Sequence, residues 1–468
     1  MARAATVHVC SACGHETPRW MGQCPGCGEW GTLTEERAPA RPAGGRGGRG
    51  GGSTGRTNGG VPPGRPTPLR DVTAPAVPRL RTGLGEVDRV LGGGLVPGSL
   101  VLLGGSPGIG KSTLLNTVLG HLQGAGRSTL YVSGEESAAQ VRLRATRLVR
   151  ADGTAGVPGA LDVPILAETD LSTIVATVEA ERPDVCVIDS VQTMSDPDLS
   201  GAPGSVGQVR EVAGRLMEVA KRLDVAMVLV GHVTKDGALA GPRVLEHLVD
   251  CVLQFEGERE RTYRTLRAHK NRFGSTNEAG VFEMHGVGLV EVLDPSARFV
   301  GEATRAAGSV VLCAMEGTRP LLVEVQALVS PSELVPPRRV CNGIDRNRLA
   351  LVLAVLARHA GVATSTSDVF VNVVGGVRAD EPGADLAVAL AVASAARGVV
   401  PGGEEQELPV ACFGEVGLTG ELRGVAHAER RLAEARKFGL RTVVHPEGTP
   451  TLRKALRAAL PSAGPGRG

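Results

Sequence analysis

A phosphate-binding loop between an apolar strand and a helix constrains this chain more than any other feature. Residues 105–113 read Gly-Ser-Pro-Gly-Ile-Gly-Lys-Ser-Thr, and only Gly104 separates them from the apolar run 100–103. Glycines let backbone amides turn toward a β-phosphate at the start of a helix, and the lysine reaches the β- and γ-phosphates. The loop therefore predicts an ATP site. Its predicted binding residues are Gly105, Ser106, Pro107, Gly108, Ile109, Gly110, Lys111, Ser112 and Thr113.

Two other strands are expected to bring carboxylates to this site. The apolar strand 185–188 is followed by Asp189, which is predicted to hold Mg²⁺ together with the hydroxyl of Ser112. The strand 129–132 is followed by Ser-Gly-Glu-Glu at the carboxyl edge of the sheet. Hydrolysis needs a carboxylate there to polarise the attacking water. Glu135 is the predicted base, with Glu136 as the alternative.

Apolar runs that alternate with helical segments predict the fold of the central region. The runs are 100–103, 129–132, 185–188 and 226–230, and the helical segments between them are 111–122, 137–149 and 206–223. Continuous apolar runs are typical of parallel strands buried on both faces, and their alternation with helices indicates a doubly wound α/β sheet. We expect this core to span residues 80–300.

The last third of the chain has a different pattern. Its expected strands are 309–315, 321–328 and 368–374, and its expected helices are 346–359 and 384–396. Pro331, Pro336 and Pro337 interrupt it, and the phosphate-binding loop does not recur. Residues 301–468 are therefore expected to form a separate α+β domain.

Two Cys-x-x-Cys pairs near the N-terminus predict a zinc site within residues 1–34. Such turns bring two thiolates to one metal, and four thiolates complete a tetrahedral sphere. The predicted ligands are Cys10, Cys13, Cys24 and Cys27. His8 and His15 are the alternative ligands, and a redox dithiol pair is the metal-free alternative.

Residues 35–79 are rich in Gly, Arg and Pro and predict a flexible linker. Its arginines either contact a nucleic-acid backbone, as Arg-Gly-Gly segments do, or merely keep the spacer soluble. The formal net charge is +2, so nucleic-acid binding has to come from a local basic surface. No apolar stretch is long enough for a membrane helix or a signal peptide, so we expect a cytoplasmic protein without membrane association.

Five segments together resemble the bacterial RadA (Sms) family, essentially from end to end. They are the four-cysteine head, Leu-Gly-Gly-Gly-Leu-Val-Pro-Gly-Ser at 91–99, the phosphate loop, Tyr-Val-Ser-Gly-Glu-Glu-Ser at 131–137 and Lys-Asn-Arg-Phe-Gly at 270–274. In that family the core resembles RecA and the last third resembles the proteolytic domain of Lon. The resemblance implies a zinc-ribbon-like head, a RecA-like P-loop ATPase core and a C-terminal α+β Lon-protease-like domain.

The resemblance also implies a function. Members of the family are DNA-dependent ATPases that process recombination intermediates and promote branch migration in RecA-mediated homologous recombination and double-strand break repair. The implied cofactors are ATP, Mg²⁺ and Zn²⁺. The implied partners are single-stranded and branched DNA, the RecA recombinase and further copies of the chain in a hexamer.

The 270–274 segment, called KNRFG below, matches a signature of the same family. It follows two expected strands, 251–256 and 263–268, interpreted as the edge where one subunit faces the next. Lys270 and Arg272 would then reach the γ-phosphate of the neighbouring subunit and stabilise transition-state charge. The alternative is a basic turn that binds a DNA phosphate.

The Lon-like part is expected to be proteolytically inactive. Lon-type cleavage needs a serine nucleophile and a lysine base. The matching stretch is 380–386, yet there is no serine from 368 to 393 and no lysine from 271 to 436. An assembly or phosphate-contact surface remains. Its candidate residues are Arg338, Arg339, Arg346, Arg348 and Arg378.

Two other functions fit the nucleotide site. A KaiC-like regulatory ATPase that acts through protein partners shares the RecA-like core, but it lacks the zinc head and the Lon-like third. A non-enzymatic scaffold that binds zinc and nucleotide would not need Glu135 and Asp189.

Overall fold

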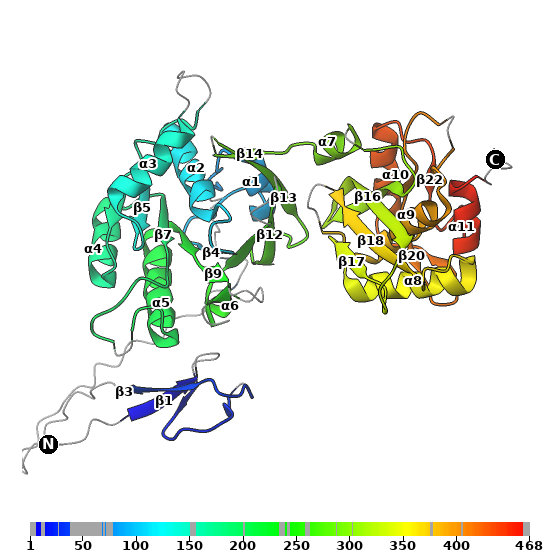
Figure 1. Cartoon of the computed structure of the whole chain (residues 1–468). Coiled ribbons are helices and arrows are strands. Elements are labelled where there is room, and N and C mark those ends of the chain that lie inside the picture. Colours follow the sequence, from blue (N-terminus) through cyan, green and yellow to red (C-terminus); the bar gives the residue numbers. More distant parts are fainter. Residues whose placement is uncertain are drawn as a thin grey trace, which may run out of the picture.

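The computed structural model divides into a small head, a central unit and a C-terminal unit (Figure 1). It describes residues 6–10, 15–26, 28–37, 68, 71, 78–149, 156–199, 202–233, 239–240, 244–257, 263–286, 288–301, 303–374, 378–403 and 406–461. Most of the predicted linker lies outside these residues. Among the helices of the described part, none has the length and apolarity needed to cross a membrane.

The head is a three-stranded antiparallel sheet in the order β2-β1-β3. Its strands are β1 (Thr6–Cys10), β2 (Glu16–Thr17) and β3 (Leu33–Arg37). Cys10, Cys24 and Leu33 form its buried cluster. Cys13 and Cys27, the other two predicted zinc ligands, lie outside the described residues.

A nine-stranded sheet forms the middle of the central unit, in the order β14-β13-β12-β11-β4-β8-β7-β5-β6. The parallel strands are β4 (Leu100–Gly105), β5 (Thr129–Ser133), β6 (Ile165–Ala167), β7 (Val185–Asp189), β8 (Ala226–Val230) and β11 (Cys251–Glu256). An antiparallel extension follows, with β12 (Tyr263–Asn271), β13 (Ala279–His285) and β14 (Gly288–Glu291). The pair β9 (His232–Val233) and β10 (Leu239–Ala240) stands apart from this sheet.

Helices cover both faces of this sheet, as the α/β prediction required. They are α1 (Gly85–Leu91), α2 (Lys111–Gly124), α3 (Ala138–Leu148), α4 (Leu171–Glu181), α5 (Val206–Leu223) and α6 (Val244–Leu248). Strand β4 shows why its whole run is apolar. Val101 and Leu103 point into the core beneath α1 and α2, whereas Leu100 and Leu102 point into the core beneath α4 and α5.

The interpretation of 251–256 and 263–268 as an edge is wrong. Strand β11 lies between β4 and β12, and β12 pairs with β13 on its other side. The hairpins after β12 add two more strands, so β14 is the edge. Apolar residues look alike in an inner strand and in an edge strand with one covered face, and the sequence did not distinguish them.

The C-terminal unit is built on a six-stranded mixed sheet in the order β17-β18-β16-β15-β19-β22. Its strands are β15 (Ser309–Glu316), β16 (Arg319–Pro331), β17 (Arg339–Asn342), β18 (Ser367–Val373), β19 (Ala411–Cys412) and β22 (Val443–Val444), with a small hairpin of β20 (Glu415–Val416) and β21 (Leu422–Arg423). Its helices are α8 (Arg346–Ala360), α9 (Asp385–Arg397), α10 (Ala428–Lys437) and α11 (Leu452–Ala459), with a short 3₁₀ turn η3 (Pro382–Ala384) before α9. Helix α9 is buried without interruption from Asp385 to Ser394, which explains its Ala-rich sequence.

The central and C-terminal units meet through named contacts. Helix α7 (Pro295–Gly301) places Phe299 in the C-terminal core, where its ring packs edge-on against Tyr263 of β12. Arg319 of β16 donates to the buried Glu86 of α1 at 2.6 Å. The turn after β15 also donates from the Thr318 amide to the carbonyl of Asn277, three residues after KNRFG.

Candidate functional site

The phosphate loop leaves β4 and enters α2 as the sequence predicts. Gly108 and Gly110 have positive φ values of 74° and 113°, so the loop needs glycine at these turns. At Gly110 a Cβ atom would also lie 2.7 Å from the terminal methyl of Met284, which would have to move aside. Helix α2 begins at Lys111, and its free amides face the space above the loop.

A polar pocket of about 330 Å³ lies at the carboxyl edge of the parallel strands. Its lining residues are Pro107, Gly108, Gly110, Lys111, Ser112, Thr113, Ser133, Glu135, Glu136, Arg144 and Asp189. Three segments that are distant in sequence thus meet at one place, as the strand order of a parallel sheet requires. Six of the nine predicted phosphate residues line this pocket, together with the predicted magnesium and base residues, whereas Gly105, Ser106 and Ile109 do not.

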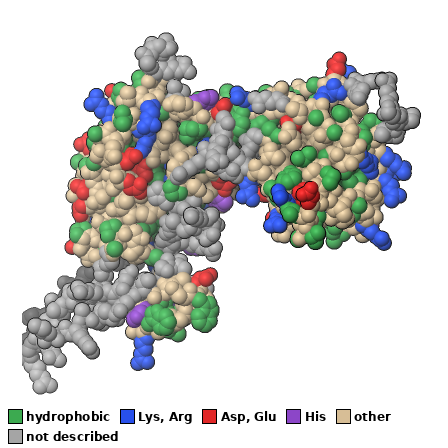
Figure 2. Space-filling model, viewed as in Figure 1, with side chains coloured by type: hydrophobic (Ala, Val, Ile, Leu, Met, Phe, Trp, Pro, Cys, Tyr) green, Lys and Arg blue, Asp and Glu red, His purple; other side chains and the backbone are tan. Residues whose placement is uncertain are grey.

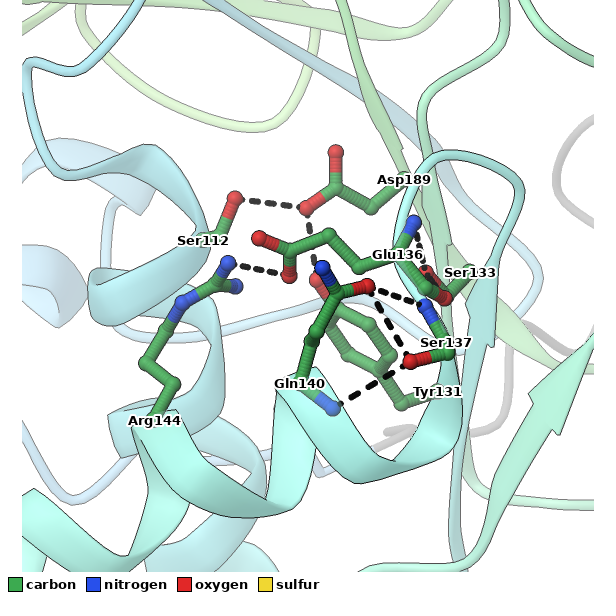
Figure 3. A network of polar contacts seen from close by, with 8 residues as sticks. All are labelled: Ser112, Tyr131, Ser133, Glu136, Ser137, Gln140, Arg144 and Asp189. Atoms are coloured by element: carbon green, nitrogen blue, oxygen red, sulfur yellow. Dashed lines mark hydrogen bonds and ion pairs between the residues drawn. The ribbon is translucent and has the colours of Figure 1, made fainter.

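Asp189 is held by two hydroxyl groups from different elements (Figure 3). Ser112 Oγ and Tyr131 Oη each donate to Asp189 Oδ2 at 2.6 Å. Oδ1 points away from both donors and receives no hydrogen bond from the described residues. A serine hydroxyl beside a carboxylate with one open oxygen fits a hard cation such as Mg²⁺, which prefers oxygen ligands.

The two adjacent glutamates have different partners. Ser190 Oγ donates to Glu135 Oε1 at 2.5 Å, and Glu135 also acts electrostatically on Lys111. Glu136 instead forms an ion pair with Arg144 of α3 (Figure 3). Because Arg144 already engages the Glu136 carboxylate, the geometry favours Glu135 as the base.

Lys111 is buried at the base of the pocket. Its ammonium group donates to the carbonyl oxygens of Gly105 at 2.7 Å and Ser106 at 3.1 Å. Burial lowers the pKa of Lys111, while the charges of Asp189 and Glu135 oppose that shift. The lysine is therefore placed beside the phosphate loop by the loop's own carbonyl groups.

KNRFG lies away from this pocket, at the end of β12. Lys270 Nζ donates to the carbonyls of Glu246 at 2.7 Å and Val249 at 2.8 Å, around the end of α6. Arg272 keeps 55% of its side chain exposed and pairs with Asp250 at 3.3 Å. Neither residue lines the pocket of its own chain.

The described half of the cysteine head has the geometry of paired metal turns. The amide of Cys10 donates to the carbonyl of His15, and the amide of Cys24 donates in the same way to Glu29, five residues on in both turns. The amide of Gly26 donates to Cys24 Sγ at 3.3 Å. Both sulfurs are buried in one small cluster. These turns fit a tetrahedral zinc site, whose other two predicted ligands, Cys13 and Cys27, lie outside the described residues.

Sequence reasoning missed two polar residues of the site, Tyr131 and Arg144. Tyr131 stands two residues before Ser133 in β5, so the period of a strand places both on the same face. That spacing was a usable signal. Arg144 comes from the second turn of α3, and its place depends on how that helix packs.

Comparisons with known proteins agree with this geometry. A family model described as an AAA domain matches residues 68–238, and one described as a rubredoxin metal binding domain matches residues 8–35. Two solved structures have low similarity. One is a KaiC-like protein from Pyrococcus horikoshii OT3 (TM-score 0.37, 20% identity, 46% of this chain and 99% of that one), and the other is an ATPase domain (0.39, 14%, 46% and 92%).

Similarity to named proteins extends over nearly the whole chain. The protein named DNA repair protein RadA of Bacillus subtilis is 47% identical, over 95% of this chain and 93% of its own length. Its namesake in Pseudomonas aeruginosa is 50% identical, over 96% and 94%. With the zinc-ribbon head, the α/β ATPase core and this identity from end to end, the chain belongs to the RadA family of DNA repair proteins.

Proposed function

We propose that this chain is a DNA-dependent ATPase that processes recombination intermediates and promotes branch migration in RecA-mediated recombination and double-strand break repair. The observation that carries the ATPase part is the convergence of Lys111, Ser112, Asp189 and Glu135 on one pocket. Membership of the RadA family supports the repair part. Single-stranded and branched DNA, RecA and a hexamer of this chain are the proposed partners.

The residues of the pocket divide the work of hydrolysis among them. Bound ATP would supply the bond to be broken, and Mg²⁺ would neutralise charge on the phosphate oxygens. Lys111 and the amides at the start of α2 hold the phosphates. Ser112 and Asp189 offer oxygen ligands to the metal. Glu135 takes the proton of the attacking water, and Ser190 fixes its carboxylate.

Of the two basic residues of KNRFG, Arg272 is the better candidate to reach the γ-phosphate bound by a neighbouring subunit. Arg272 is half exposed and leaves one ion pair, whereas Lys270 would have to leave the carbonyls that it caps. A cation beside a neighbour's γ-phosphate stabilises the transition state. Arg272→Ala should keep its nucleotide affinity and lose most DNA-stimulated hydrolysis. The control is Arg210→Ala, which changes an exposed residue of α5 and should keep DNA-stimulated hydrolysis. Equal activities of the two variants would exclude this role.

The C-terminal unit is proposed to be a Lon-like platform without proteolytic activity. Arg431, only 1% exposed, donates to Glu381 and to the carbonyl of Cys313. A Cβ atom on Gly383 would lie 3.0 Å from Arg431 Nη1, so a longer side chain there would disturb this ion pair. A buried arginine of α10 thus forms an ion pair with the segment 380–386, in which the resemblance would place a nucleophile.

Of the five predicted arginines of this unit, Arg338, Arg346 and Arg378 are exposed, whereas Arg339 and Arg348 are held within the unit. Arg348 pairs with Asp385, and Arg339 donates to the carbonyls of Thr364 and Ser367. Further exposed basic residues lie on three helices, and Arg397, Arg453 and Arg457 among them line one pocket. They are Arg358 on α8, Arg397 on α9, and Arg453, Lys454 and Arg457 on α11. Figure 2 shows Lys and Arg side chains at this outer margin, and we propose that they contact DNA phosphates.

The test measures ATP hydrolysis by the full chain with and without single-stranded DNA, at several salt concentrations. We expect stimulation by DNA that declines as salt rises. Lys111→Ala should abolish hydrolysis, and Lys221→Ala, an exposed change on α5, should not. A three-strand exchange reaction with RecA then tests branch migration. If single-stranded DNA leaves the rate of ATP hydrolysis unchanged at every salt concentration, the proposal is contradicted and a KaiC-like regulatory ATPase is favoured.

A further inference from the structure

We propose that Tyr131 is a positioning residue for the magnesium site: its buried phenol fixes Asp189 so that only one carboxylate oxygen is left to face the metal. The inference rests on the proposed roles of Ser112 and Asp189 in holding Mg²⁺. It adds a residue to which neither the sequence motifs nor the family comparisons give a role.

The backbone register places the phenol correctly. Tyr131 pairs with Val187 and Ser133 pairs with Asp189 across the parallel strands β5 and β7. Side chains two residues apart in a strand share a face, so Tyr131 and Ser133 point to the same side as Asp189. Tyr131 is paired with Val187, two residues before Asp189 in β7. The length of the tyrosine side chain lets its hydroxyl reach Asp189 Oδ2 from there.

The ring cannot easily move. Tyr131 is 1% exposed and belongs to the core cluster beneath α2, with Leu114, Leu115 and Val118. A packed tyrosine has two side-chain torsions, so its hydroxyl position is set by the core.

Both donors use the same oxygen of Asp189. With Ser112 and Tyr131 on Oδ2, the carboxylate cannot rotate without breaking two hydrogen bonds of 2.6 Å. Oδ1 is therefore held on the side of the carboxylate that points away from Ser112 and Tyr131, as Figure 3 shows. Residues that hydrogen-bond a metal ligand orient it, and their loss typically lowers metal affinity by about 10- to 100-fold.

The first experiment compares Tyr131→Phe with Tyr263→Phe in the full chain. These are its two tyrosines, and the second substitution removes a phenol far from the pocket. Binding of Mn²⁺ to the ADP-loaded protein is measured by electron paramagnetic resonance, and binding of a fluorescent ADP analogue is measured in EDTA. We expect Mn²⁺ affinity to fall about 10- to 100-fold in Tyr131→Phe alone, with ADP affinity in EDTA unchanged. Unchanged Mn²⁺ affinity, or an equal loss of ADP affinity in EDTA, would overturn the inference.

Two further measurements test the positioning role of Tyr131 separately from the assignment of Asp189 to Mg²⁺ and separately from any folding defect. Asp189→Asn should weaken Mn²⁺ binding by itself, and adding Tyr131→Phe to it should change nothing more. If Asp189→Asn binds Mn²⁺ normally, the magnesium site itself is misassigned. In protein labelled with 3-fluorotyrosine, the Tyr131 resonance, assigned with Tyr263→Phe, should shift when Mg²⁺ joins ADP. A resonance that stays in place would overturn the inference without any change at position 131.

Discussion

Replacement of Arg431 tests whether a buried ion pair holds the segment before α9 against α10 and β15. The guanidinium donates to Glu381, to the carbonyl of Cys313 at 2.7 Å and to that of Ala426 at 3.0 Å. It also lies 5.5 Å from the centre of the Phe413 ring. Arg431→Met keeps much of the volume but removes the charged partner of Glu381, which retains, among the described residues, only the hydrogen bond from the Met315 amide.

The magnitude follows from burial. Removing one partner of a buried pair destabilises by about 3–5 kcal/mol. Because Glu381 keeps 21% of its side chain exposed, water recovers part of the loss and we expect about 3 kcal/mol, near the low end of that range. That corresponds to roughly a hundredfold larger opening constant.

The assay is hydrogen exchange followed by mass spectrometry on peptides from α10 and β15. Exchange resolves the C-terminal unit, which tryptophan fluorescence does not, because Trp20 and Trp30 both lie in the head. The control is Arg430→Ala, whose guanidinium is exposed and donates to the carbonyl of Thr318. Adding Glu381→Met to Arg431→Met should recover stability, since an apolar pair is tolerated where a single buried charge is not. Equal protection in Arg431→Met and Arg430→Ala would refute the reasoning.

Three other predictions concern the junction, the head and the pocket. Burial raises the pKa of Glu316 above its usual 4.5 although Arg267 opposes the shift, so the folded chain binds more protons there. Its contribution to stability should therefore decline as pH rises from 4.5 through the folded pKa, and Glu316→Gln should remove that decline in urea titrations across this range. Elemental analysis should find about one zinc per chain. The zinc should be lost when Cys10 and Cys27 are both replaced by serine, and it should be kept in the control Cys341→Ser. Equal zinc content in the unchanged chain, the double variant and the control would reject the ligand set. Arg144→Ala should weaken nucleotide binding in EDTA roughly five- to tenfold, because the unpaired Glu136 carboxylate would repel the phosphates by at least about 1 kcal/mol. An unchanged dissociation constant would show that the Arg144–Glu136 ion pair does not affect nucleotide binding.

Local patterns in the chain were sufficient for much of the fold. The apolar runs at 100–103 and 185–188 became β4 and β7, and the helical spacing at 206–223 became α5. Such signals depend on neighbouring residues only, so the sequence carries them in full. The order of the strands and the position of the edge depend on contacts between distant segments, and there the interpretation of 251–268 failed.

The candidate site divides in the same way. The sequence by itself determined the phosphate loop, because a run of nine residues contains its own turn, its glycines and its lysine. It also supplied Asp189 and Glu135, each at the end of an apolar strand. Only the tertiary structure decided that Tyr131 supports Asp189 and that Arg144 holds Glu136, because strand register and helix packing bring these groups together. The strand period indicates on which face Tyr131 lies, but the hydrogen bonds themselves join residues 58 and 8 positions apart and form only in the folded chain.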